Sequence, residues 1–493
     1  MPSSSPSPVI LWFRKDLRLD DNGAVTAAVE SEAPVICIYI REPATGSIGP
    51  LGGAQEWWLH HSLEALSARL AEAGNRLILR TGEAGEVLRQ LAAETGAQAL
   101  FLNRLYERDA EDAELLKSVQ EAGLEIRRFK GQLLHDPQTM RTGTGGAYRV
   151  YTPFWRALER EGEPRDPMDA PERIPPPGGD LSSEDLAGWN LRPQTPDWAV
   201  EFPDHWQPGE NGARQRLERF IEEAIGSYKK ARDFPGLEDT TSQLSPHLAF
   251  GEITPARVWQ ATQGLQATEN LIHFRKELVW REFCYHLLVE FPKLGSANWN
   301  SRFDAFVWQD APSHFDAWTK GMTGYPIVDA GMRQLWRHGY MHNRVRMITA
   351  SFLIKDLMID WRKGEAWFRD TLVDADPASN AANWQWVAGS GADASPFFRI
   401  FNPILQGEKF DPDGDYVRRF IPELGRLPKK YIHKPFAAPD QVLSTAGVRL
   451  GETYPKPIVD HGAARDRALQ AYGRVKNQAG AQGEQGGAKG AGH

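Results

Sequence analysis

The first 134 residues alternate short apolar runs with helical patterns, and this alternation restricts the fold more than any other feature. A glycine follows three of the helical patterns, where a helix is expected to stop: Gly74, Gly96 and Gly123. Repeated strand–helix–strand units predict a doubly wound parallel sheet, and hence an α/β domain over residues 1–134. No G-x-G-x-x-G motif follows the first run, so nothing favours an NAD-binding site. The predicted strands are Val9–Phe13, Val35–Ile40, Arg76–Leu79, Ala99–Asn103 and Glu125–Phe129.

The rest of the chain divides into three parts. Residues 135–205 are rich in Pro and Gly and predict a connector, whose aromatic piece 148–158 is expected to pack on a domain. Residues 206–475 carry helical patterns and few strand signals, so we expect an all-α domain. The low-complexity tail, 476–493, is predicted to be disordered. The longest expected helical stretches are 213–231, 268–290, 326–338, 342–359 and 362–373.

Composition narrows the class of protein. No uninterrupted apolar run reaches the ~18 residues of a membrane span, and the N-terminus lacks the pattern of a secretory signal. Only two cysteines are present, Cys37 and Cys284, which excludes a disulfide framework and a four-cysteine zinc site. We therefore expect a cytoplasmic protein and no metal site.

The net charge of −8 argues weakly against nucleic-acid binding, but the charge is unevenly distributed. Residues 1–270 carry 28 basic and 41 acidic side chains, whereas residues 271–493 carry 29 and 24. A locally basic face can bind phosphates even on an acidic protein. The C-terminal half is therefore compatible with nucleic-acid binding.

Residues 374–411 combine two carboxylates, a central Asn, a Trp-Gln-Trp triplet and an Arg between aromatics. In this stretch Asp374, Asp376 and Asn380 precede Trp384 and Trp386. Carboxylates and amides bind the polar edges of heterocycles, and Trp rings stack on flat aromatics. A packing explanation also exists, in which a capped turn precedes a buried helix.

A second motif lies within residues 273–286. On a helix, Glu277, Trp280, Arg281 and Cys284 share one face. A Glu, a Trp and an Arg make a poor hydrophobic stripe. The alternative is a surface ion pair between Glu277 and Arg281, with Trp280 packed beside it.

A third motif lies within residues 339–352, where Asn343, Arg346 and Met347 share a helical face and Arg344 sits to one side. These side chains suit a phosphate-and-base site better than a core. The alternative is a solvated basic helix turn.

A fourth motif, within residues 228–255, offers hydroxyl groups and backbone N–H groups close together. Thr241, Ser242, Leu244 and Ser245 lead into a helix, and such a run can cradle a phosphate. A Ser/Thr-rich helix cap explains the same residues.

Together, and in this order, the four segments resemble the helical domain of DNA photolyases and cryptochromes. Residues 9–25, VILWFRKDLRLDDNGAV, resemble the first strand and turn of that family. The resemblance covers nearly the whole chain except the connector and the tail. It implies an α/β domain followed by an all-α domain that binds FAD. The implied FAD contacts are Tyr228, Thr241, Ser242, Leu244, Ser245, Glu277, Arg281, Asn343, Arg346, Asp374, Asp376 and Asn380.

By the same resemblance Asn380 faces flavin N5, where plant cryptochromes usually have Asp and animal ones Cys. An Asn favours the photolyase branch. A (6-4) photolyase would have His at the positions of Asn343 and Met347, so the resemblance implies a cyclobutane pyrimidine dimer as substrate. Single-strand-preferring relatives usually have Tyr at the position of Trp386. The implied lesion contacts are Glu277, Trp280, Asn343, Arg344, Met347 and Trp386.

Trp384, Trp361 and Trp308 match the family's electron chain, and packing is an equally compatible role for each. The implied reaction is light-driven electron transfer from reduced FAD to a flipped dimer in UV-damaged DNA, which makes the chain a carbon–carbon lyase. We expect a monomer. The alternative is a flavin blue-light receptor without repair activity, and a third possibility is an adenosine-nucleotide-binding α/β module with an unrelated helical partner.

The resemblance also implies a second, light-harvesting chromophore near the N-terminal domain. The segment Asn103–Tyr106–Glu107 only partly resembles folate-binding members. Gln55, Trp57 and Trp58 suit either an antenna pocket or helix packing. A methenyltetrahydrofolate is preferred over a deazaflavin.

Overall fold

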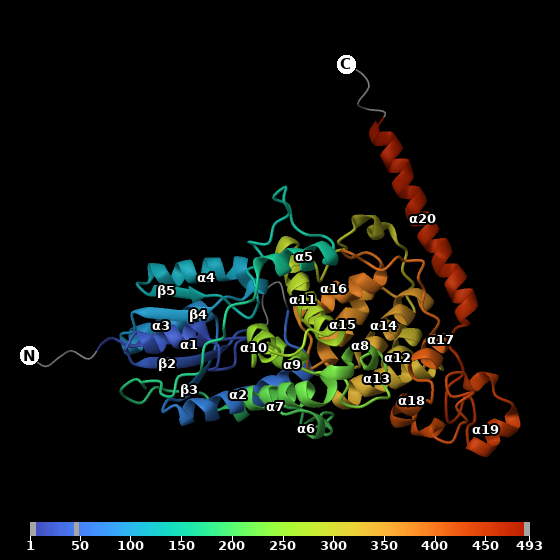
Figure 1. Ribbon diagram of the computed structural model, residues 1–493, viewed down its shortest axis with the longest axis horizontal. Helices are drawn as coiled ribbons and strands as arrows, with labels where there is room; N and C mark the ends of the chain where they lie inside the picture. The colour runs from blue at the N-terminus through green and yellow to red at the C-terminus, as the bar shows by residue number, and fades with distance from the viewer. Residues whose placement is uncertain (1–5, 44–48, 488–493) are drawn as a thin grey trace, which may run out of the picture.

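The computed structural model describes residues 6–43 and 49–487, and its two bodies lie side by side (Figure 1). The N-terminal body contains one parallel sheet of order β3-β2-β1-β4-β5, which confirms the predicted doubly wound domain. The strands are β1 (Val9–Phe13), β2 (Val35–Arg41), β3 (Leu77–Thr81), β4 (Ala99–Asn103) and β5 (Glu125–Phe129). The helices are α1 (Gly23–Glu30), α2 (Gly53–Glu72), α3 (Ala84–Thr95) and α4 (Asp109–Glu121).

The central strands β1, β2 and β4 are buried on both faces, because alternate residues of each strand point to opposite cores. In β1, Leu11 and Phe13 pack in one core with α1 and α2. Ile10 and Trp12 pack in the other core with α3 and α4. Largely apolar strands are therefore required at the centre of the sheet, whereas the edge strand β5, EIRRF, is exposed or half-buried.

The connector is ordered and touches both bodies. Its helix α5 (Tyr151–Glu161) places Phe154 and Trp155 in the core of the helical body. The chain then returns along the sheet domain, where Ile174 N–H donates to the carbonyl of Ala73 and Glu184 N–H to that of Leu79, both at 2.9 Å. A short helix α6 (Phe202–His205) leads into the second body.

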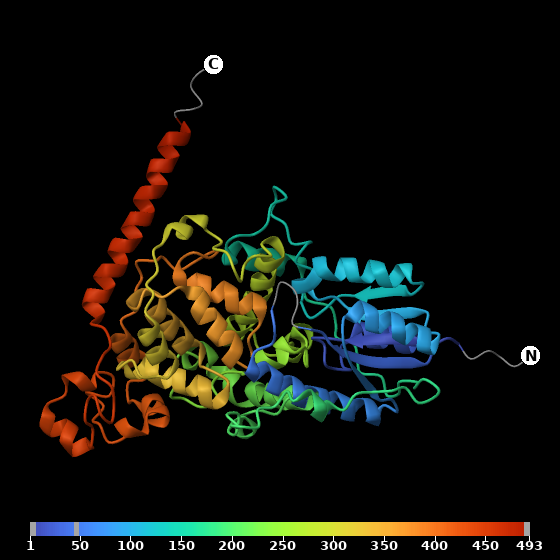
Figure 2. The same ribbon diagram turned by 180° about the vertical axis from the view of Figure 1, so that it is seen from behind.

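The second body is helical, as predicted. Two expected helices are interrupted. The stretch 213–231 forms α7, then a π-helical turn at 220–224, and then α8. The stretch 342–359 begins as α14 and continues into a π-helical turn at 352–356. The tail predicted to be disordered continues α20 as far as Gly487, away from the body in both views (Figures 1 and 2), and 488–493 lie outside the described residues. The helices are α7 (Glu210–Arg219), α8 (Tyr228–Ala231), α9 (Ser245–Ala249), α10 (Pro255–Ala261), α11 (Glu269–Glu290), α12 (Pro312–Thr319), α13 (Pro326–His338), α14 (Asn343–Ser351), α15 (Trp361–Thr371), α16 (Pro377–Ala388), α17 (Pro403–Phe410), α18 (Asp415–Phe420), α19 (Asp440–Ala446) and α20 (His461–Gly487).

Buried polar contacts join the two bodies. The carboxylate of Glu252, only 2% exposed, accepts from Trp58 Nε1 at 3.0 Å and from Ser62 Oγ at 2.7 Å, both on α2, and also contacts His247 Nδ1 of α9. Glu210 accepts from the backbone N–H groups of Leu19 and Asp20, each at 3.0 Å. Because each acceptor lies in one body and its donors lie in the other, the bodies are fixed relative to one another.

Across 6–43 and 49–487, none of the helices combines the length and the apolar character that crossing a membrane would require.

Candidate functional site

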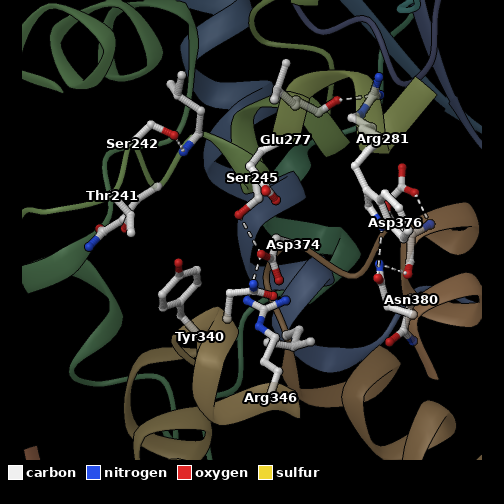
Figure 3. A pocket seen from close by; sticks show the side chains of 18 of the residues that line it. Thr241, Ser242, Ser245, Glu277, Arg281, Tyr340, Arg346, Asp374, Asp376 and Asn380 are labelled. Carbon is white, nitrogen blue, oxygen red and sulfur yellow. Dashed lines mark hydrogen bonds and ion pairs between the residues drawn. The ribbon is translucent and has the colours of Figure 1, made fainter. Parts of the chain in front are cut away.

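A cavity of about 480 Å³ opens within the helical body, in the size range of ligand pockets. Its walls come from α8, α11, α14 and α16, from the loop before α9, and from the turn between α15 and α16 (Figure 3). All twelve residues predicted to contact FAD line it. Four sequence segments separated by up to about 150 residues therefore meet in one place.

The loop before α9 bends tightly around one end of the cavity. Asp239 and Gln243 adopt left-handed backbone conformations, with φ of 50° and 49°. Two such turns so close together allow Thr241, Ser242 and Ser245 to line the same cavity (Figure 3). The loop thus supplies the hydroxyl groups that the fourth sequence motif predicted.

A partly buried ion pair between Arg346 and Asp374 lines the cavity. Arg346 donates to Asp374 Oδ2 at 2.9 Å, and the Ser245 hydroxyl donates to the same oxygen at 2.6 Å. Arg346 is fixed further by its Nε donating to the carbonyl of Met341 at 2.6 Å. The other oxygen of Asp374 is buried without a hydrogen-bond partner among the described residues. An uncompensated carboxylate oxygen next to a guanidinium fits a ligand edge that both donates and accepts hydrogen bonds, as an isoalloxazine edge does.

In the second motif, Glu277 and Arg281 do not form the surface ion pair that the alternative reading proposed. Glu277 forms its ion pair with Arg232, which the sequence reasoning had not selected. Arg281 instead donates to the carbonyls of Gln132 at 2.9 Å and Leu248 at 3.3 Å. Both side chains reach the cavity because Glu277 and Arg281 are one turn apart on α11.

The first turn of α16 is fixed by Asp376, which accepts from Ser379 N–H at 2.7 Å as the helix cap and from the Tyr285 hydroxyl at 2.6 Å. One turn later, Asn380 donates its amide to Glu365 Oε1 at 2.9 Å and to the Glu365 carbonyl at 3.1 Å. Burial raises the pKa of Glu365. Because the amide nitrogen is used on that side, the Asn380 carbonyl oxygen is the atom left for a ligand.

Five of the six predicted lesion contacts line the same cavity. Trp280, Met347 and Trp386 line it together with Glu277 and Asn343. Arg344 does not line this cavity. It lines an adjacent depression that shares Met347 and Trp386, and it pairs there with Asp233 at 2.7 Å. This depression also contains Lys229, Lys230, Arg399 and Lys409, so the neighbourhood is basic.

The three predicted electron-chain tryptophans lie in or against one core, and Trp308 is the most exposed of them. Trp384 lines the cavity and is 3% exposed, and Trp361 is fully buried, with its Nε1 donating to Asn298 at 2.9 Å. Trp308 is partly exposed and packs on Phe306, with ring centroids 4.5 Å apart. Trp361 and Trp308 do not line the cavity. The predicted role of passing electrons to Trp384 does not require them to line it.

Sequence reasoning missed several polar residues of the cavity. Arg232 and Gln243 lie inside the fourth motif, and Tyr340 lies inside the third. Asn383 lies between Asn380 and Trp384. Only the position of Asn383, three residues after Asn380 on a helix, offered a signal for finding it.

The residues considered for an antenna site are occupied in packing. Trp57 and Trp58 are buried in the core between the two bodies, and Gln55 donates to the carbonyl of Ala375 at 2.8 Å. Asn103 donates to Asp16 at 2.6 Å. The helix-packing alternative therefore describes Gln55, Trp57 and Trp58 in this structure.

Comparisons with known proteins give consistent matches. The family model described as "DNA photolyase" matches residues 9–175, and the one described as "FAD binding domain of DNA photolyase" matches residues 274–474. A "Deoxyribodipyrimidine photo-lyase" of Agrobacterium fabrum is 64% identical over 479 residues, covering 96% of this chain and 99% of its own length.

Two solved structures extend these matches to the fold. The crystal structure of a bacterial class III photolyase from Agrobacterium tumefaciens superposes with a TM-score of 0.94 at 63% identity, covering 97% of this chain and 99% of its own. A cryptochrome of Synechocystis superposes with a TM-score of 0.86 at 30% identity, covering 95% and 100%.

Proposed function

The chain belongs to the DNA photolyase and cryptochrome family, and on that premise we propose that it repairs cyclobutane pyrimidine dimers in UV-damaged DNA under blue or near-UV light. One observation carries the proposal: the same cavity is lined by the twelve predicted FAD contacts and by the aromatic and thioether side chains predicted to hold the lesion. Electron transfer from a cofactor to a substrate requires both to be held close together, and this cavity brings the two sets of residues together.

The chain's own residues have separate tasks in this proposal. FAD, when bound and reduced, supplies an electron donor that light excites. The hydroxyl groups of Thr241, Ser242 and Ser245 bind the pyrophosphate, and Arg346 with Asp374 binds the polar edge of the isoalloxazine. Asn380, oriented by Glu365, would offer its carbonyl oxygen to the isoalloxazine. The remaining contacts, Tyr228, Leu244, Glu277, Arg281, Asn343 and Asp376, enclose the cofactor.

The lesion is held at the open side of the cavity. Trp280, Trp386 and Met347 provide flat or polarisable surfaces for two joined pyrimidines that have left the stack, and damaged bases are the easiest to flip. Glu277 offers a hydrogen-bond acceptor to the pyrimidine edges, and the Asn343 amide offers both a donor and an acceptor. Arg344 and the basic depression beside it suit the flanking phosphates.

The choice of dimer over (6-4) product rests on Asn343 and Met347, which stand where a (6-4) photolyase would have His, and His342 does not replace them. A catalytic His would have to face the lesion, but His342 accepts from Arg344 N–H at 3.2 Å as the cap of α14. Burial lowers the pKa of His342 to about 4, so it is neutral near pH 7. Asn343 and Met347 occupy the positions that line the cavity.

Trp384, Trp361 and Trp308 are proposed to carry electrons from the solvent-facing side to oxidised FAD. Their burial supports this direction, because exposure increases from Trp384 and Trp361 to Trp308. We further propose a methenyltetrahydrofolate antenna, on the strength of the family resemblance, and a monomer in the cytoplasm. The two free cysteines, Cys37 and Cys284, are both buried and suit a reducing compartment.

Repair assays test the main proposal. The purified, reduced protein is given one oligonucleotide with a cyclobutane thymine dimer and another with a (6-4) product, in light and in darkness. We expect restoration of the dimer only, and only in light. Repair of neither, with FAD bound and photoreducible, would favour the photoreceptor alternative, for which the cryptochrome-like fold is the supporting observation. Mass spectrometry of the extracted chromophores and sedimentation analysis test the antenna and the monomer.

A further inference from the structure

Trp280 has one polar atom, and a side chain from another helix accepts its hydrogen bond. Trp280 lies on α11, and its Nε1 donates to Asn383 Oδ1 of α16 at 3.1 Å. Its ring packs against Tyr151, with centroids 4.7 Å apart at 53°, and against Phe283, at 5.6 Å and 56°. Trp280 and Asn383 both line the cavity.

Asn383 is itself held in one orientation. Its Nδ2 donates to the carbonyl of Ser379, one turn earlier on α16, at 2.8 Å. A carbonyl only accepts and an indole N–H only donates, so the amide has one assignment that satisfies both partners. The oxygen of Asn383 must therefore face Trp280.

This hydrogen bond selects between two orientations of the Trp280 ring. The outer torsion of a Trp side chain is broad and roughly two-fold, so two ring orientations compete. Contacts with the rings of Tyr151 and Phe283 restrict where the indole plane lies, but they give its N–H no acceptor. The hydrogen bond to Asn383 is directional and favours one orientation.

The bond also sets the distance between the two aromatic walls. Trp280 belongs to α11, whereas Trp386 follows Asn383 by three residues on α16 and so lies on the same helical face. We infer that Asn383 is a positioning residue, which orients Trp280 relative to Trp386 and thereby tunes affinity for the flipped dimer. The inference rests on the proposed function, since it assumes that the lesion sits between these rings.

A double-mutant cycle of Asn383→Ala and Trp280→Phe tests the inference. Asn383→Ala removes the acceptor, and Trp280→Phe removes the donor while keeping an aromatic face. We expect each single variant to bind a dimer-containing oligonucleotide about fivefold more weakly, the equivalent of one neutral hydrogen bond. The effect is modest because Asn383 is exposed, so water can reach the freed indole N–H. Affinity for the undamaged oligonucleotide should not change.

The double variant should bind no more weakly than Trp280→Phe alone, because Asn383 acts only through the indole N–H. In steady-state repair by prereduced protein, KM for the dimer should rise and kcat should stay constant, whereas a general loss of structure would lower both. FAD content and photoreduction serve as folding controls.

Two results would overturn the inference: unchanged dimer affinity of Trp280→Phe, or an Asn383→Ala effect that persists in the Trp280→Phe background. The first remains decisive even if Asn383→Ala does not fold. A wild-type protein without preference for the dimer would instead refute the proposed function, so the two failures are distinguishable.

Discussion

Replacing Glu282 by glutamine should stabilise the protein at alkaline pH far more than at pH 5. Glu282 lies on α11 and is 3% exposed. One of its oxygens accepts from Leu134 N–H at 2.9 Å and from His135 N–H at 3.4 Å, so it holds the connector onto the helical body. Within 6–43 and 49–487 the other oxygen has no hydrogen-bond partner, and it lies 3.8 Å from Arg281. The carboxylate is thus only partly compensated for leaving water.

Burial raises the pKa of Glu282 from an ordinary 4.5 to about 7. Between these two values the folded protein binds more protons than the unfolded chain, so the free energy of unfolding falls as pH rises. At about 1.4 kcal/mol for each tenfold change in proton affinity, the loss approaches about 3 kcal/mol above pH 7. Glu282→Gln mimics the protonated acid and does not titrate, so it removes this pH-dependent loss of unfolding free energy. Any other effect of the substitution on stability is the same at every pH.

Urea unfolding of the wild type and of Glu282→Gln at pH 5 and pH 8.5 measures the difference. The stability gap between the two proteins should grow in favour of the variant by between about 2 and 3 kcal/mol from the lower to the higher pH. Other titrating groups contribute equally to both proteins and cancel. An equal gap at both pH values would refute the reasoning, because it would show that Glu282 keeps an ordinary pKa in the folded state.

Three further predictions concern the cavity. Trp280→Ala should weaken binding to a dimer-containing oligonucleotide by about 1–3 kcal/mol, the value of one stacking contact, and unchanged fluorescence anisotropy titrations would contradict it. Trp384→Phe should slow photoreduction of oxidised FAD, followed by absorbance, but leave dimer repair intact in prereduced protein; lost repair there would mean that Trp384 acts in another way. Asp374→Asn should weaken FAD binding by about 2 kcal/mol, since a charged hydrogen-bond acceptor facing Arg346 is lost. Full FAD occupancy after dialysis of that variant would argue against this.

The fold was predictable because its patterns are local. Strand and helix periods identified all five strands of the sheet, and only strand ends differ, as where β2 continues to Arg41. The π-helical turn at 352–356 was not predictable, because it changes backbone pairing without changing the apolar pattern. The extension of α20 into the tail was not predictable either, because residues 476–487 include four glycines, which disfavour a helix.

The site was predictable mainly where it resembles known family members. Periodicity alone placed Glu277 and Arg281 on one face but gave Glu277 the wrong partner, because Arg232 is 45 residues away in sequence. Asn383 was missed because a polar residue on a helix surface looks solvated until the facing helix is known. Trp57 and Trp58 could not be assigned, since an apolar pattern shows that a face is buried but not against what.

The polar interface around Glu252 limits how this molecule can be recombined. Its donors belong to α2 and its acceptor to the other body, so each half is incomplete alone. A chimaera that joins the sheet domain of one relative to the helical body of another would leave a buried carboxylate or a buried indole N–H without a partner wherever the two relatives differ at the positions of Trp58, Ser62 or Glu252. A graft of either half should therefore succeed only when these three positions match across the new interface.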